Sequence, residues 1–241
     1  MYPGALPKTG GYDRVATMFS PKGRLYQVEY AAKIVEQGTL GLGIVYNKGV
    51  LLAASKNISS PLLFPGSVEK LFKLDDHIGV ISAGLVGDAR RLVKMAREKA
   101  QENQMHYEEP IEVEALAKEI SGIKQIFTQY AGMRPFGVSF IFGGVNHGEK
   151  RLFETEPSGA LARYKATAIG RNKLKAMELL EKKYNEKMTL QQAVKLAVEV
   201  IKYSGDKKEP FSLDSLDFAF IEDEKEFERI SPLKLKSFLG K

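Results

Sequence analysis

The sequence predicts an α+β fold in which two β-sheets stack face to face and pairs of helices cover their outer faces, a four-layer αββα sandwich. Two observations lead to this prediction. The expected strands are apolar along nearly their whole length, as in residues 40–46 and 50–56, which is typical of strands covered on both sides. The helical patterns come in pairs, within residues 85–130 and within 173–203, and each pair can cover one sheet.

Before the first strand lie a tail, a loop and a helix. Residues 1–11 hold two Pro and three Gly and no hydrophobic periodicity, which predicts a flexible tail. Residues 12–23 are loop-like and end on the turn-forming run SPKG. An amphipathic helix follows, and Gly38 lies where a glycine commonly ends a helix. Apolar residues at three- and four-residue intervals mark its buried face: Leu25, Val28, Ala32 and Val35.

The rest of the chain has no internal repeat and no linker long enough to divide it, so residues 12–241 are expected to form a single domain. The run NKG at 47–49 predicts a tight hairpin between strands at 39–46 and 50–56. Thr189 suits the N-cap of a helix. Further strands are expected at 70–74, 78–83, 138–143, 151–155, around 164–169, 216–221 and 227–230, and further helices at 85–104, 111–130, 173–184, 190–203 and after Pro232.

Composition excludes several classes of protein. The 36 basic and 30 acidic residues of this 241-residue chain give a net charge of +6, but they alternate along the expected helices. Nucleic acid is therefore excluded as the main partner, since it would require a basic stripe with aromatic residues. No apolar run has the length of a membrane helix, and the first residues lack the apolar core of a secretory signal. Because cysteine is also absent, we expect a cytoplasmic protein without disulfides.

Neither a metal nor a cofactor is expected. The three histidines, at 77, 106 and 147, are far apart in sequence and form no H-E-x-x-H motif. No P-loop or G-x-G-x-x-G motif follows an expected strand. An S-x-x-K match at 67–70 and a K-T-G match at 8–10 occur in the wrong order for a penicillin-binding enzyme, so we attribute them to chance.

The N-terminal stretch combines YDR at 12–14, FSP at 19–21 and GRLYQVEYA at 23–31. These blocks resemble the signature of archaeal-type proteasome α-subunits, which form the non-catalytic outer rings of the 20S core particle. The resemblance implies the αββα fold of proteasome subunits and N-terminal-nucleophile hydrolases, with the α-subunit helix ahead of the first strand. It continues to about residue 203 through VEK at 68–70, DDH at 75–77, GLV at 84–86, Tyr130 with RPFG at 134–137, RLFE at 151–154, PSG at 157–159 and KATAIG at 165–170.

The same fold also builds hydrolases whose nucleophile is an N-terminal threonine, and Thr39 lies where that nucleophile would be. Such a threonine needs its free α-amine, with a pKa near ~8, as the base. In this chain the nitrogen of Thr39 is an amide bonded to Gly38, and Ser55 lies where catalytic β-subunits carry an acid. We therefore expect no catalytic residue. The alternatives are an amidohydrolase of the same fold that cuts itself at Gly38 and uses Thr39, and a free monomeric binding module.

The resemblance implies a heptameric α-ring that lies on rings of β-subunits, which hold the active threonines. The ring would control the passage of unfolded polypeptide substrates, and the tail would close its pore. In the family, four residue types hold the open gate, and all four are present here. The aromatic ones are alternatively ordinary packing residues. The corresponding positions are Tyr12, Asp13, Pro21 and Tyr30.

The resemblance also implies a docking pocket between adjacent α-subunits for the C-termini of activators such as AAA+ ATPases. Lys70 matches the lysine that pairs with the activator's terminal carboxylate, and the alternative is a solvated strand lysine. Lys22 replaces a usual Asp near this contact, and Gly87 replaces a usual Ala. Other positions that line the pocket are Gly23, Arg24, Gly38, Gly84 and Leu85.

A loop after the second helix of the first pair corresponds to the annulus that narrows the entrance pore in the family. Its small residues suit a sharp bend. Ala131 replaces a common second glycine, which changes the expected shape of the loop. The annulus residues are Tyr130, Ala131, Gly132, Met133 and Arg134.

Overall fold

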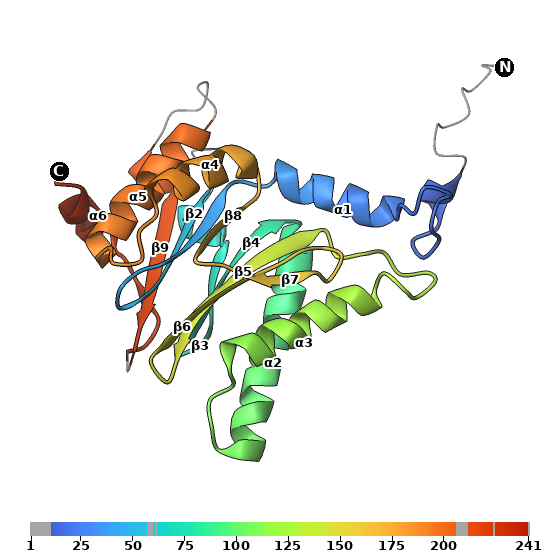
Figure 1. Cartoon of the computed structure of the whole chain (residues 1–241), viewed down its shortest axis with the longest axis horizontal. Helices are drawn as coiled ribbons and strands as arrows, with labels where there is room; N and C mark the ends of the chain where they lie inside the picture. Colours follow the sequence, from blue (N-terminus) through green and yellow to red (C-terminus); the bar gives the residue numbers. More distant parts are fainter. Residues whose placement is uncertain (1–10, 57–59, 61, 206–211, 224, 241) are drawn as a thin grey trace.

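The computed structural model describes residues 11–56, 60, 62–205, 212–223 and 225–240. The described strands form two five-stranded antiparallel sheets that face each other (Figure 1). In order across the sheet, sheet A consists of β10 (Glu228–Arg229), β9 (Leu216–Glu222), β2 (Gly49–Ser55), β1 (Gly41–Val45) and β8 (Ala166–Ile169), and sheet B consists of β3 (Leu71–Asp75), β4 (Ile78–Gly84), β5 (Val138–Asn146), β6 (Glu149–Thr155) and β7 (Leu161–Arg163).

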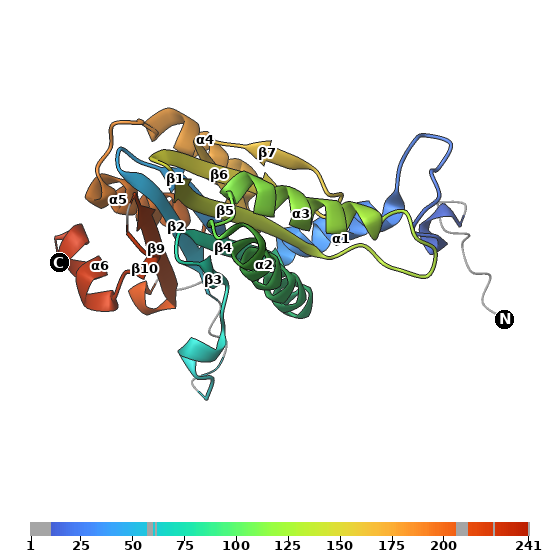
Figure 2. The ribbon, with the colours of Figure 1, turned by 90° about the horizontal axis from the view of Figure 1, so that it is seen from below.

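Helices cover both outer faces, so the predicted four-layer αββα sandwich is confirmed (Figure 2). Sheet B is covered by α2 (Val86–Tyr107) and α3 (Val113–Ile126), and sheet A by α4 (Lys173–Lys183) and α5 (Leu190–Ser204), beside which α6 (Pro232–Leu239) packs. The first helix, α1 (Tyr26–Gln37), lies against one end of β4 and β5. Short 3-10 turns occur at Tyr12–Arg14, Pro65–Ser67 and Leu213–Ser215.

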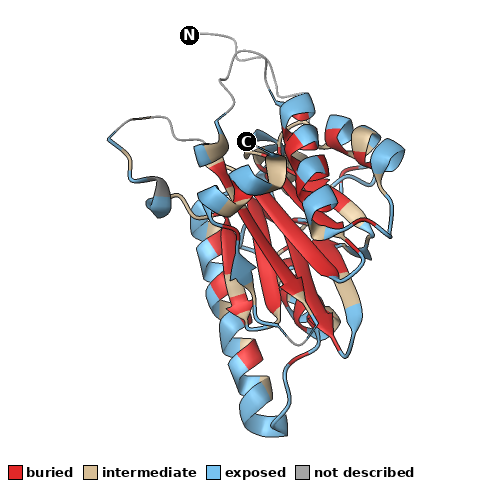
Figure 3. Cartoon of the chain, turned by 90° about the vertical axis from the view of Figure 1, so that its left-hand side faces the viewer, coloured by how far each residue is buried: buried red, intermediate tan, exposed pale blue. Residues whose placement is uncertain are grey.

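Strand β5 shows why a continuous apolar run correctly predicted a strand that is covered on both faces. All nine of its residues are buried, because alternate side chains enter different cores. Phe140 and Phe142 pack with α2 and α3, whereas Ile141 and Val145 pack between the two sheets. A strand covered on both faces therefore reads as a continuous apolar run. The buried strands in the middle and the exposed outer sides of the helices are visible in Figure 3.

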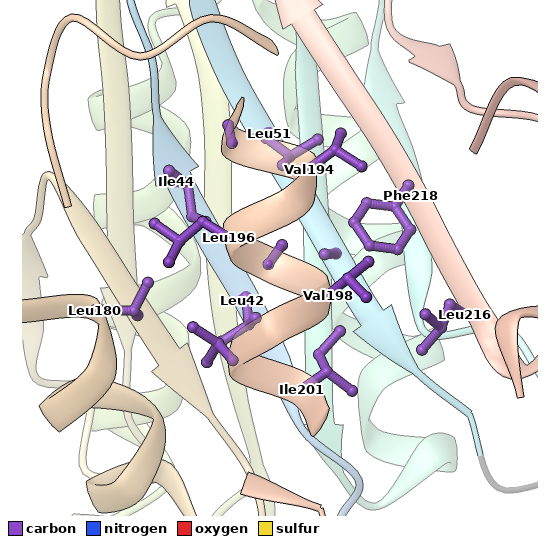
Figure 4. Packing of buried hydrophobic residues seen from close by; sticks show 14 of the residues in the cluster. Leu42, Ile44, Leu51, Leu180, Val194, Leu196, Val198, Ile201, Leu216 and Phe218 are labelled. Atoms are coloured by element: carbon purple, nitrogen blue, oxygen red, sulfur yellow. The ribbon is translucent and has the colours of Figure 1, made fainter. Parts of the chain in front are cut away.

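Helix α5 is fixed to sheet A by its apolar face (Figure 4). Val194, Val198 and Ile201, at helical spacing, are buried with Leu42 and Phe218 of the sheet. Each buried side chain of this size contributes about 1.5–3 kcal/mol relative to an exposed one. The predicted N-cap is also confirmed, since the Thr189 hydroxyl accepts from the backbone N–H of Gln192 in a capping box.

The strand expected around 164–169 is confirmed as β8, shortened to four residues, in sheet A. A second short strand that was not predicted, β7, lies just before it in sheet B, so the chain crosses from one sheet to the other. The crossing residues pair with both sheets: Tyr164 N donates to Leu152 O in β6, and Lys165 O accepts from Val45 N in β1. A pattern of local hydrophobicity cannot distinguish one bent strand from two strands in different sheets.

Two glycines have a role in close backbone packing that the sequence did not predict. Gly38 does lie at the end of α1, but its backbone is extended (φ −66°) and not left-handed as in a glycine cap. A Cβ atom at Gly38 would lie 2.8 Å from the backbone nitrogen of Gly84, so close approach of two segments requires the glycine. The hairpin predicted at 47–49 is confirmed, since β1 and β2 pair antiparallel and Gly49 N donates to Tyr46 O at 3.4 Å across the turn. Gly49 is also the first residue of β2, where a Cβ atom would lie 2.0 Å from the Ile221 carbonyl oxygen.

Other boundaries shift at the ends of elements. The helix expected to run to residue 130 ends at Ile126, and the strand expected at 227–230 shortens to Glu228–Arg229. The helix expected to end at 104 continues to Tyr107. Among the described residues, no helix combines the length and the hydrophobicity needed to cross a membrane.

Candidate functional site

Lys70 lies directly before β3, and its side chain turns into the protein. The residue is only 7% exposed, and its Nζ donates to Thr39 O and Thr39 Oγ1 at 2.5 Å each and to Ser55 O at 3.2 Å. Burial lowers the pKa of Lys70 to about 7, because removal from water disfavours the ammonium form, while the charge of Asp217 acts in the opposite direction. The contacts hold the ammonium at the point where α1 joins β1.

Thr39 is the second member of this contact. Its hydroxyl donates to Ser55 O at 2.5 Å and accepts from the Lys70 ammonium. Ser55 contributes its main-chain carbonyl. The peptide unit before Thr39 is part of the fold, since Gly38 N donates to Val35 O at 3.0 Å and Gly38 O accepts from Arg171 N at 2.8 Å. The nitrogen of Thr39 is an amide in this chain and cannot act as a base.

Gly38, Gly84 and Leu85 lie near this contact. The register of β3 and β4 brings the start of β3 beside Ser82, and Ser82 N donates to Lys70 O at 2.9 Å. Gly84 has a φ of +119°, a conformation that other residues rarely adopt, and it approaches Gly38 closely. Leu85, the next residue, is partly exposed. The structure thus brings together four of the six residues predicted for the docking pocket.

The other two predicted pocket residues, Gly23 and Arg24, lie before the opposite end of α1. A twelve-residue helix is about 18 Å long, so the two groups are well separated within one chain. Arg24 is exposed and pairs with Glu29, which places its guanidinium over the first turn of α1, 4.8 Å from the ring centre of Tyr26. One copy of the chain therefore does not assemble the whole predicted pocket.

The predicted gate residues lie around the start of α1. Tyr12 and Asp13 form a 3-10 turn that Gln27 fixes to the helix by donating to Asp13 O. Pro21 is exposed in a turn closed by Gly23 N donating to Ser20 O at 2.8 Å. Tyr30 is half-buried on α1, with the Lys33 ammonium 5.7 Å from its ring centre. Residues 1–10 of the predicted tail lie outside the described residues.

The predicted annulus is an exposed loop after α3. Tyr130 is 58% exposed, and Gly132 has a φ of +83°, which explains a glycine at this bend. Ala131 and Met133 are also exposed. The loop is anchored at its far end, because the Arg134 guanidinium donates to both carboxylate oxygens of Asp88 at 2.7 Å.

Asp88 connects this anchor to the main chain of the next segment. Its Oδ2 also accepts from Gly137 N at 2.9 Å. Burial by itself would raise the pKa of Asp88, but the hydrogen bonds from Arg134 and Gly137 outweigh burial and lower the pKa below its usual range. A carboxylate at the first turn of α2 thus holds the base of the loop in place.

A second buried lysine was missed by sequence reasoning. Lys124 of α3 has no exposed surface, and its Nζ donates to Thr155 Oγ1 at 2.6 Å and lies 4.8 Å from the ring centre of Phe140. Burial lowers its pKa to about 7. Its position four residues after Ile120, on the apolar face of α3, was the available signal. No group of three or more His, Cys, Asp or Glu residues that could hold a metal occurs in the part of the chain that the structure describes.

Comparisons with known proteins agree with the resemblance. A family model described as "Proteasome subunit" matches residues 35–221, and a second model, described as the N-terminal signature of A-type proteasome subunits, matches residues 12–33. The chain is similar to the proteasome alpha subunit of Methanothermobacter thermautotrophicus, at 49% identity over 89% of this chain and 86% of the relative. It is also similar to the proteins of the same name from Methanoregula boonei (46% identity, 95% of each chain) and Methanopyrus kandleri (45%, 95% of this chain and 92% of the relative).

Proposed function

The chain belongs to the proteasome subunit family as an α-type member, and from this premise we propose that it is a non-catalytic subunit of the outer ring of a 20S core. Seven copies or close paralogues would form the ring, which lies on β-subunits that cut the substrate. The ring admits unfolded polypeptides and docks activators such as AAA+ ATPases by their C-termini. The absence of cysteine fits a reducing cytoplasm.

One observation carries the proposal that the chain does not cut: the nitrogen of Thr39 is bonded into a packed segment. Helix α1, directly ahead of it, buries Ala31 and Val35, and Val35 belongs to the core between the two sheets. Release of Thr39 by cleavage after Gly38 would leave this partly buried helix as a detached piece. The hydroxyl and the lysine of a threonine hydrolase are in contact here, but the amine base and the acid are missing.

The docking pocket needs two copies of the chain. Lys70, Gly38, Gly84 and Leu85 gather at the C-terminal end of α1, whereas Gly23 and Arg24 lie before its N-terminal end. In the proposed ring, the start of α1 in one copy lies beside the end of α1 in its neighbour. A pocket formed in this way exists only after assembly, so activators would bind rings and not free subunits.

The gate is proposed at the other group of residues. Tyr12 and Asp13 directly follow the proposed tail, and Pro21 and Tyr30 lie before and after the start of α1. The hydrogen bond from Gln27 to Asp13 O fixes the turn at Tyr12–Arg14 to the helix. The composition of residues 1–11, with two prolines and three glycines, predicts a tail held by few contacts, so we expect its displacement to cost little free energy. The exposed loop of residues 130–134 would narrow the pore beneath it, anchored by Arg134 and Asp88.

Deletion of residues 2–11 tests the gate. In particles assembled with β-subunits, we expect the variant to degrade an unfolded protein about 3- to 10-fold faster without any activator. The reason is that the rate at which substrate enters is proportional to the fraction of time for which the pore is open, and the deletion raises this fraction. The measurement is the release of fluorescent fragments from a labelled casein-like substrate.

The control is the full chain in the same particles, with a tripeptide substrate that needs little opening. A variant particle whose β-subunit nucleophile is replaced by alanine must lose all activity in both cases. Equal rates of protein degradation by the deleted and full chains would contradict the proposed gate.

A further inference from the structure

We propose that Thr39 is a positioning residue for Lys70: its hydroxyl holds the ammonium inward and competes with any carboxylate that docks in the pocket. The identity of the ligand rests on the proposed function. The hydrogen bonds that keep the ammonium inside the protein do not, because they involve only residues of a single chain. Activator affinity would then depend on a residue beneath the pocket as well as on those that line it.

The hydrogen bonds of the ammonium support this inference. A lysine ammonium has three donors and no acceptor. In the structure Nζ lies within hydrogen-bonding distance of three oxygens: Thr39 O, Thr39 Oγ1 and Ser55 O. A fourth oxygen, Leu40 O, lies at 3.5 Å. An incoming carboxylate therefore finds no unused N–H and must replace one of the internal acceptors.

The hydroxyl is the acceptor that can be replaced most readily. The other oxygens within reach belong to main-chain carbonyls at the edges of β1 and β2, where Ser55 N donates to Leu40 O at 2.9 Å and keeps the two segments paired. The Thr39 hydroxyl belongs to a side chain, and it keeps its own donor bond to Ser55 O after the ammonium leaves. Moving the Lys70 ammonium outward therefore has a free-energy cost, and the hydrogen bond to the Thr39 hydroxyl contributes part of that cost.

The charges near the ammonium favour the inward position only weakly. Asp217 attracts Lys70, but it also forms an ion pair with Lys56 at 2.7 Å. Glu69, the preceding residue, pairs with Arg229. A ligand carboxylate that meets Lys70 outside would supply a full negative charge, and the ammonium would no longer be buried. When a carboxylate docks, Lys70 loses its hydrogen bond to Thr39 Oγ1. A substitution at Thr39 changes this part of the free energy of docking.

The test replaces the hydroxyl without changing the shape of the residue. Thr39→Val removes Oγ1, Thr39→Ser keeps a hydroxyl and should behave as the unchanged chain, and Ser55→Ala is a control because Ser55 contributes only its carbonyl oxygen. The first readout is the rate at which an amine-selective anhydride labels Lys70 in the purified full-length chain, followed by mass spectrometry. We expect Thr39→Val to be labelled about 3- to 10-fold faster at Lys70, less than a whole charge-assisted hydrogen bond would give, because the carbonyl oxygens of residues 39 and 55 still accept from the ammonium.

Lys124 provides an internal reference in the same sample. It is also buried and bonds to Thr155, away from the substitution, so its labelling rate should not change. Faster labelling of both lysines would mean general loosening of the fold and would overturn the proposal. Unchanged labelling of Lys70 in Thr39→Val would overturn it as well.

The second readout is binding of a synthetic peptide that carries the last ten residues of a proteasome-activating AAA+ ATPase to assembled rings. With a free C-terminal carboxylate, the peptide should bind Thr39→Val rings about 3- to 10-fold more tightly than unchanged rings, and its C-terminal amide should show no such gain. Weaker binding to Thr39→Val would mean that the hydroxyl assists the carboxylate, which overturns the competition. If Lys70 in Thr39→Val is labelled faster but the peptide binds to no ring, the hydrogen bond between Thr39 and Lys70 is supported. The same result would refute the proposed docking function.

Discussion

Replacing Lys70 with alanine is expected to weaken activator binding by about 10- to 100-fold per site, while the ring still assembles. The reason is the loss of a charge-assisted hydrogen bond between the ammonium and the activator's terminal carboxylate, which contributes about 1.5–3 kcal/mol. The measurement is activator binding to assembled particles, together with activator-stimulated degradation of an unfolded protein.

The structure calls for two controls in this experiment. Lys73→Ala removes a partly exposed lysine of β3, three residues after Lys70, where it pairs with Asp76, and should leave activator binding unchanged. Lys70→Met keeps the length of the buried side chain, so it separates the charge from the packing. Loss of binding in both Lys70 variants with normal ring size supports the assignment. Unchanged stimulated degradation in Lys70→Ala would refute it.

Replacing Gly84 with alanine is expected to lower the free energy of unfolding by more than about 3 kcal/mol. The residue has a φ of +119°, and a Cβ atom there would lie 2.0 Å from the Gly137 carbonyl oxygen. Gly137 cannot move away easily, because its N–H donates to Asp88 and its carbonyl accepts from Leu85 N at 2.9 Å. Urea denaturation followed by circular dichroism measures the change.

Gly87 offers a matched control three residues away. It lies in the first turn of α2, and beyond the adjoining backbone of that helix no atom lies within 4 Å of the position that a Cβ atom would take. Gly87→Ala should therefore raise the free energy of unfolding by up to about 1 kcal/mol. Equal stability of Gly84→Ala and the unchanged chain would contradict the explanation that close backbone approach requires the glycine at 84.

The layers of the fold could be predicted because burial on both faces leaves a local trace. Strand β5 is apolar throughout, and the stripe on α5 has helical spacing, so each element reveals its own surroundings. The crossing at Tyr164 and Lys165 left no such trace, since both flanking strands are short and their partners lie far away in sequence. The close packing at Gly49 could not be predicted for the same reason: its neighbour, Ile221, comes 172 residues later.

For the site, the sequence supplied the residues and the structure supplied their relations. The resemblance named Lys70, Gly38 and Gly84 together, but their proximity depends on the register of β3 against β4. That Lys70 donates to Thr39 could not be predicted, because the direction of a long side chain depends on the acceptors that the fold places around it. The separation of Gly23 and Arg24 from the other pocket residues likewise follows from the length of α1.

The most direct test of the central claim is the intact mass of the chain recovered from particles assembled with β-subunits, combined with a peptide-hydrolysis assay of the chain alone. A subunit that guards an entrance and does not cut should retain the residues ahead of Thr39, near the 26.8 kDa of the full sequence, and should hydrolyse no peptide by itself. A recovered chain that begins at Thr39 and hydrolyses peptides without a partner would contradict the account.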